Sequence, residues 1–127
     1  MHTPPLPART VLLRHDLPDG SWHWDWMLER APGKPLLSFR ISARVDLPET
    51  LEFQAQRTPD HRPTYLHYQG PVSNNRGTVT RIASGTVESL SDEPGECRVT
   101  VAFGPFRRTW SGRPKTDPHW QFQTCET

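Results

Sequence analysis

The segment Ser21–Glu29, SWHWDWMLE, threads a histidine and an aspartate between tryptophans. In an extended strand, successive side chains point to opposite faces of the sheet. His23 and Asp25 then share one face, with their Cα atoms about 7 Å apart. An imidazole and a carboxylate at this spacing can bind one divalent metal ion or one phosphate group.

The aromatic side chains of the same segment fall on the other face. Trp22, Trp24 and Trp26 are followed by Leu28 at a two-residue spacing. A helix would scatter the indoles around its circumference, so the pattern favours a strand. We expect the three tryptophans to pack in the core and to hold the polar pair rigidly, because aromatic residues bury the most area. The alternative is a surface on which nucleic-acid bases stack.

A third residue of the same chemistry precedes this strand. His15 ends the candidate strand before the turn sequence LPDG, so a hairpin would bring it toward His23 and Asp25. Two imidazoles and one carboxylate leave positions on a divalent ion for water and substrate. The same residues are also typical of a solvated strand face, and on their own they leave both interpretations open.

The composition indicates one soluble domain. The chain has 127 residues, of which 33% are hydrophobic, and its 14 prolines disfavour long helices. No apolar run approaches the length of a membrane span, and the start MHTPPLPART lacks the apolar stretch of a signal peptide, so we expect a cytoplasmic protein. Cys97 and Cys125 form no CxxC motif, and a disulfide between them stays open.

Bulk charge says little about partners. The formal net charge is +1, which does not by itself indicate nucleic-acid binding. Most of the cations are arginines, whose planar guanidinium fits phosphate. Ordinary surface charge explains them equally well.

Short alternating segments separated by Pro, Gly, Asn and Asp predict a mostly β fold, a small antiparallel β-barrel with little helix. We expect residues 1–9 to form a disordered Pro-rich tail and residues 10–127 to form a single domain. A short helix or turn is expected at Asp46–Leu51. The expected strands are Thr10–His15, Ser21–Arg30, Pro35–Ile41, Thr50–Gln56, Thr64–Gln69, Gly77–Ile82, Gly85–Leu90, Glu96–Phe103, Phe106–Trp110 and His119–Thr124.

Three segments, in this order and spacing, carry a family resemblance. They are RHDLPDGSWHWDWMLE, PDHRPTYLHYQGPV and RGTVTRIASGTVE. Together they resemble the 3′-phosphoesterase domain of bacterial DNA ligase D, over about Val11 to Trp120. The middle segment shares with that family the form Asp–His–x–x–x–Tyr–Leu–x–aromatic–x–Gly, which begins here at Asp60.

The resemblance implies a metal-dependent phosphoesterase that heals nucleic-acid 3′ ends in DNA repair, on DNA or RNA–DNA. It would remove a 3′-phosphate or a 3′-terminal ribonucleotide, in company with separate ligase or polymerase proteins. His15, His23 and Asp25 would bind the metal, typically manganese, with zinc or another divalent ion as the alternative. His61 would contact the scissile phosphate and donate a proton, and Tyr65 would hydrogen-bond the phosphate.

The chain departs from the family where the family clamps phosphate. Met27 and Phe53 replace arginines, and Pro59 replaces an acidic residue. Losing these contacts would weaken substrate binding and transition-state stabilisation together. The arginines that could substitute include Arg14, Arg57 and Arg76. Two other classes therefore stay open: a non-catalytic barrel that binds a metal or a nucleic-acid end, and a purely structural domain.

Overall fold

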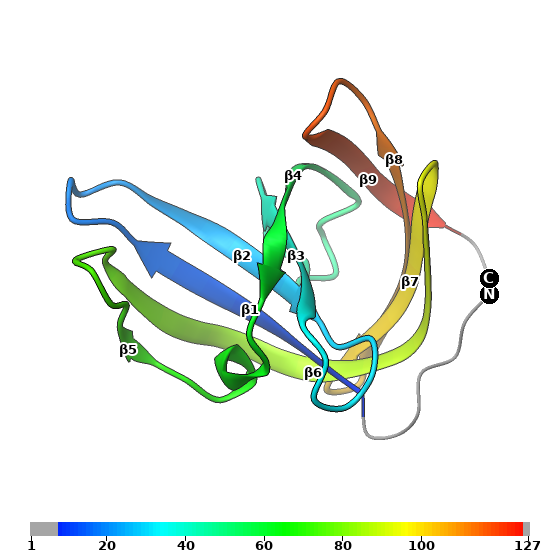
Figure 1. Cartoon of the computed structure of the whole chain (residues 1–127). Helices are drawn as coiled ribbons and strands as arrows, with labels where there is room; N and C mark the ends of the chain where they lie inside the picture. The colour runs from blue at the N-terminus through cyan, green and yellow to red at the C-terminus, as the bar shows by residue number, and fades with distance from the viewer. Residues whose placement is uncertain (1–7, 126–127) are drawn as a thin grey trace.

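The computed structural model describes residues 8–125, which form one antiparallel sheet and a single short helix (Figure 1). The prediction of a mostly β, antiparallel fold with little helix is confirmed. The elements are β1 (Arg9–Asp16), β2 (Trp22–Leu28), β3 (Leu36–Ile41), β4 (Glu52–His61), the 3₁₀-helix η1 (Pro63–Leu66), β5 (Gly70–Pro71), β6 (Thr78–Glu93), β7 (Glu96–Phe103), β8 (Phe106–Pro114) and β9 (His119–Cys125).

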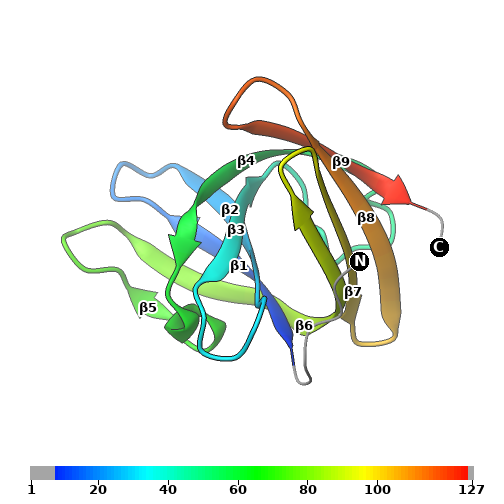
Figure 2. The same ribbon diagram turned by 45° about the vertical axis from the view of Figure 1, so that its right-hand side comes forward.

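The sheet closes on itself. Its strand order is β1-β2-β3-β4-β9-β8-β7-β6-β5, and β1 also pairs with β6 (Figure 2). The first half of β6, from Thr78 to Thr86, pairs with β1, and its second half, from Thr86 to Glu93, pairs with β7. This long strand completes the ring and leaves the two-residue β5 as an outer edge. Closure removes the long unpaired edges that an open sheet of this size would present.

The two strands expected at Gly77–Ile82 and Gly85–Leu90 are one continuous strand, β6. Gly85, at the expected boundary between them, lies inside this strand. A Cβ at Gly85 would lie 2.0 Å from the carbonyl oxygen of Ala102, so this glycine lets β6 and β7 approach closely.

The strand expected at Thr64–Gln69 is also wrong. Pro63 opens η1 there, because its fixed φ suits the first position of a helix. The segment Asp46–Leu51 is a turn and bend without a helix, and β4 extends to His61, beyond the expected end at Gln56. Among residues 8–125, no helix is long and apolar enough to cross a membrane.

The expected tail boundary needs correction at its inner end. Arg9 begins β1, and the side chain of Ala8 is buried in the core. Residues 1–7 of the expected Pro-rich tail lie outside the described residues.

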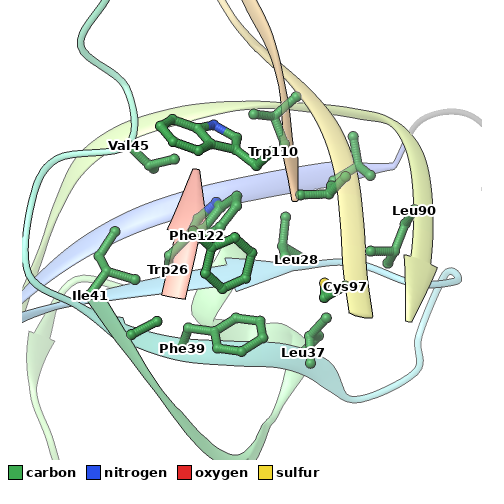
Figure 3. Packing of buried hydrophobic residues seen from close by; sticks show 14 of the residues in the cluster. Trp26, Leu28, Leu37, Phe39, Ile41, Val45, Leu90, Cys97, Trp110 and Phe122 are labelled. Carbon is green, nitrogen blue, oxygen red and sulfur yellow. The ribbon is translucent and has the colours of Figure 1, made fainter. Parts of the chain in front are cut away.

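The inner face of the ring carries the main core, which is rich in aromatic rings (Figure 3). Trp26, Phe39 and Phe122 are fully buried and contact one another, with ring centroids 5.0–6.4 Å apart. The indole N–H of Trp26 donates to Thr10 Oγ1 at 2.9 Å, so its one polar group is also satisfied. Aromatic packing of this kind compensates for the low hydrophobic content of the chain.

The tryptophans of β2 do not all anchor the core, contrary to the prediction. Trp26 is fully buried and Trp24 is half-buried, but Trp22 is 42% exposed. The three do share the face opposite His23 and Asp25, as strand alternation requires. The reason for the gradient is visible in Figure 1, where the β1–β2 hairpin extends away from β7, β8 and β9. The first residues of β2 therefore lack a facing strand to bury them.

A smaller hydrophobic cluster covers part of the outer face of the ring. Its buried members come from β1, β2, β3, η1 and β6, and they are Val11, Leu13, Met27, Leu36, Leu66 and Val79. Tyr65 and Tyr68 pack against it. Strands β1 and β2 are thus buried on both faces along part of their length. The polar face predicted for β2 is correspondingly interrupted by Met27, which is 1% exposed.

Candidate metal centre

The three predicted metal ligands lie together on the outer face of the β1–β2 hairpin. Antiparallel pairing places His15 directly opposite His23, and Leu13 opposite Asp25. Alternation along each strand then turns the three polar side chains to the same side. Their candidate ligand atoms all lie within 4.8 Å of one another, and this is the one such group among the residues that the structure describes.

The spacing of the ligand atoms fits one metal ion. His23 Nε2 lies 3.2 Å from Asp25 Oδ1, and His15 Nδ1 lies 3.7 Å from Asp25 Oδ2. Ligands bound about 2.0–2.2 Å from a common ion lie about 3.0–3.5 Å from one another. The two imidazole–carboxylate distances are close to this range, and all three ligand atoms lie within 4.8 Å of one another, so binding one ion requires the side chains to close around it. The donor set of two nitrogens and one oxygen suits manganese, zinc and similar divalent ions.

A backbone carbonyl sets the orientation of His15. Its Nε2 lies 2.6 Å from the carbonyl oxygen of Arg76. A carbonyl only accepts hydrogen bonds, so Nε2 carries the hydrogen, and Nδ1 is the ring nitrogen that faces Asp25. Metal-binding histidines commonly donate their other N–H group in this way, which fixes both tautomer and ring direction.

The loop that supplies this carbonyl has an unusual backbone. Asn74 and Asn75 have φ angles of 61° and 53°, and Gly77 has a φ of 97°. A Cβ at Gly77 would lie 2.0 Å from the carbonyl oxygen of Asp16. Asparagine and glycine are the residues that tolerate such conformations, so the sequence SNNRG builds the loop that reaches His15.

Asp25 is buried without a permanently charged partner. It is 6% exposed, between the imidazoles and the apolar Leu13 on the neighbouring strand. Within residues 8–125, its side-chain contacts to charged or titratable groups are those to His15 and His23. A buried carboxylate is costly unless a cation compensates it. A divalent ion at this position would supply the missing positive charge.

His61 and Tyr65 form a separate pair. Their ring centroids lie 5.6 Å apart, and Tyr65 packs against the outer hydrophobic cluster. His61 pairs with Leu36 on β3, whereas Asp25 pairs with Arg40 on the same strand, about 13 Å farther along. The structure therefore places His61 on the outer face but apart from the group of His15, His23 and Asp25, which is called the metal group below. His61 Nδ1 is buried and has no hydrogen-bond partner among the described residues.

Two of the three predicted phosphate-binding arginines point elsewhere. Arg14 lies on the opposite face of β1 from His15, with its guanidinium 4.1 Å from the Trp22 ring centroid. Arg57 makes two hydrogen bonds to Asp92 on the inner face, at 3.0 and 3.1 Å. Strand alternation explains both placements, because each of these arginines occupies a position whose side chain points to the inner face, opposite the face that carries His15, His23 and Asp25.

Arg76 is the predicted arginine that does meet the metal group. Its carbonyl contacts His15, while its guanidinium bonds to the main chain and side chain of Ser73. Its contribution in this structure is therefore through the backbone.

Sequence reasoning missed Arg40. It pairs directly with Asp25 across β2 and β3, and its side chain is exposed on the same face. The signal was present in LLSFRIS, where Arg40 is the only charge in an otherwise apolar and serine segment. Recognising its place beside Asp25 required the register of the β2–β3 pair, which the intervening loop does not fix.

The positions where the family has arginines are apolar and buried here. Met27 belongs to the outer hydrophobic cluster, and Phe53 stacks on Phe122 in the main core, with centroids 5.1 Å apart. Neither position could accept an arginine without exposing or repacking its cluster. Comparison with known proteins finds no family model that matches the chain and no curated protein that matches its sequence.

Proposed function

We propose that the protein is a divalent-metal-dependent phosphoesterase that removes a 3′-phosphate or a 3′-terminal ribonucleotide from nucleic acid. The observation that carries the proposal is the cluster of His15, His23 and Asp25, with His15 oriented by a backbone carbonyl. The resemblance of three ordered sequence segments to the ligase D 3′-phosphoesterase domain supplies the reaction class.

In this proposal the residues around the cluster have separate roles. Asp25 and the neutral rings of His15 and His23 bind the ion, and the Arg76 carbonyl keeps His15 Nδ1 directed at it. A bound metal would polarise the phosphoryl oxygens and lower the pKa of a bound water. The neighbouring apolar residues Leu13 and Val79 limit solvent access on the β6 side of the cluster.

The direct test is phosphate release from an oligonucleotide that ends in a 3′-phosphate. We expect wild-type protein to produce a 3′-OH end with manganese and to stop when a chelator is added. Asp25→Asn should abolish turnover because it removes the only carboxylate of the group. Asp16→Asn is the matched control, since this half-buried carboxylate follows His15 but points to the other face and pairs with Arg14. A folded wild-type protein that releases no phosphate with any of several divalent ions would contradict the proposal.

A second candidate is a barrel that binds the metal and a nucleic-acid end without turnover. It is favoured by the separation of His61 from the metal group and by the buried Met27 and Phe53. In that case manganese binding and oligonucleotide binding should persist, while the 3′-phosphate remains intact.

A further inference from the structure

A groove opens on the outer face of the ring beside the metal group. Its volume is about 340 Å³, and it spans strands β2, β3, β4 and β9. Trp24, Ile41 and Ala55 are paired in one row across three of these strands, and the side chains of Ile41 and Ala55 are buried inside the ring. Their backbone therefore forms the floor. The side chains that rise from the outer face on either side are His23, Ser42, Gln54, Arg40, Gln56 and His119.

The groove shares a wall with the metal group. His23 belongs to both, with Nε2 directed at Asp25. Arg40, on the opposite wall, is the cross-strand neighbour of Asp25, and such Cα atoms lie about 4.5–5.5 Å apart. A group bound in the groove would thus lie within reach of both the metal ligands and the guanidinium of Arg40.

The polar side chains of the lining are of the kinds that bind an anion. Arg40 is its only permanently charged residue, and no carboxylate lines the groove. Within residues 8–125, the Arg40 side chain has no hydrogen bond or ion pair, unlike Arg57 and Arg76. The amides of Gln54 and Gln56, the hydroxyl of Ser42 and the ring of His119 add neutral hydrogen-bonding groups. A free guanidinium fork among neutral donors matches the oxygens of a phosphate.

We propose that this groove binds the terminal nucleotide of a single nucleic-acid strand, with Arg40 as its phosphate-binding cation. The inference rests on the proposed function for the identity of the ligand. It assigns Arg40 the task that the buried positions Met27 and Phe53 cannot perform. The volume lies at the small end of the range for small-molecule sites, which suits one nucleotide rather than a duplex.

The test measures binding without the metal, so that it does not depend on turnover. The probe is a fluorescein-labelled oligothymidylate of about eight nucleotides with a 3′-phosphate, followed by anisotropy in the presence of a chelator. We expect Arg40→Gln to weaken binding by at least about tenfold and to reduce its salt dependence. Arg40→Lys should give an intermediate affinity, because a lysine retains the charge but not the fork.

Matched controls separate this role from a general effect of charge. Arg107→Gln, an exposed arginine near the β7–β8 turn that pairs with Glu88, should change affinity by less than about twofold. Arg40→Gln should keep the thermal midpoint and the manganese affinity of the wild type, because Arg40 is exposed and is not a ligand. Inorganic phosphate should compete only weakly with the oligonucleotide.

Three results would overturn the inference: no binding by the wild type, equal binding by Arg40→Gln, or competition by inorganic phosphate as effective as that by the oligonucleotide. The outcome is distinct from that of the activity test. Binding that depends on Arg40 without any phosphate release would remove the phosphoesterase and keep the groove. Phosphate release together with binding that does not depend on Arg40 would support the phosphoesterase and overturn the role of the groove.

Discussion

Two acidic side chains of this protein have opposite surroundings. Asp92 lies between two guanidiniums: Arg57 bonds it at 3.0 and 3.1 Å, and Arg30 reaches it at 3.4 Å while also pairing with Asp60. Asp25 is more deeply buried, at 8% side-chain exposure against 20%, yet it faces two imidazoles. The first carboxylate has its countercharge built into the chain, and the second does not.

The difference separates a structural ion network from a candidate binding site. In the Asp92 network, burial lowers the pKa of Arg30, but the contacts with Asp60 and Asp92 together raise it by more. The net shift of this pKa is therefore upward. The charges there stabilise one another in the folded state. Around Asp25 the same compensation is left for an ion from solution, which is the arrangement that metal sites adopt.

The sharpest way to break this comparison is to neutralise Asp25. Asp25→Asn should weaken manganese affinity by more than about 100-fold, since it removes a direct ligand rather than a supporting contact. In the absence of metal, the free energy of unfolding should rise rather than fall, because the substitution removes a buried carboxylate that no cation of the chain compensates. Calorimetric titration with manganese and urea unfolding measure the two effects. Strong destabilisation with intact metal binding would make the cluster a structural element.

The reciprocal change is Asp92→Asn. It leaves Arg57 without its carboxylate, so we expect a loss of about 1–3 kcal/mol of stability, below the value for a fully buried pair because these side chains retain some exposure. Manganese affinity should stay within about twofold of the wild type, since no ligand is touched. Urea unfolding and the same metal titration provide the measurements. An equal loss of metal affinity would show that the two clusters are coupled.

The third prediction concerns how stability depends on pH through Cys97, the cross-strand partner of Asp92. Burial, and next the charge of Asp92, raise the pKa of this thiol from 9.0 to about 12. The unfolded thiol ionises above pH 9 while the folded one keeps its proton, so stability is complete below pH 9 and declines from there toward pH 12. The expected decline is about 1.4 kcal/mol per pH unit.

This decline can be isolated by comparing urea unfolding of wild type and Cys97→Ala between pH 9 and 11. The variant should show the shallower pH dependence, although its buried side chain is smaller and its stability at neutral pH is lower. Parallel curves for the two proteins would mean that Cys97 is not held protonated by its surroundings.

The sequence allowed the metal group to be predicted because its geometry is local. Alternation along β2 and one hairpin turn suffice to place His15, His23 and Asp25 together. Arg40 was not predicted because its position depends on the register of the β2–β3 pair. The Arg76 carbonyl was not predicted because it lies on the loop between β5 and β6. The exposure of Trp22 was not predicted for a related reason. Alternation shows which face of the sheet a residue lies on, but not whether another strand covers that face.

The loop between β5 and β6 also limits how this chain can vary in evolution. The distance that the chain covers from Ser73 to the Arg76 carbonyl is set by the number of residues between them and by the left-handed conformations of Asn74 and Asn75. Only the main chain of Arg76 meets His15, so changes of its side chain should be tolerated far better than insertion or deletion of one residue. Homologues that keep the metal group should accordingly share this loop length, even where the letters of the loop differ.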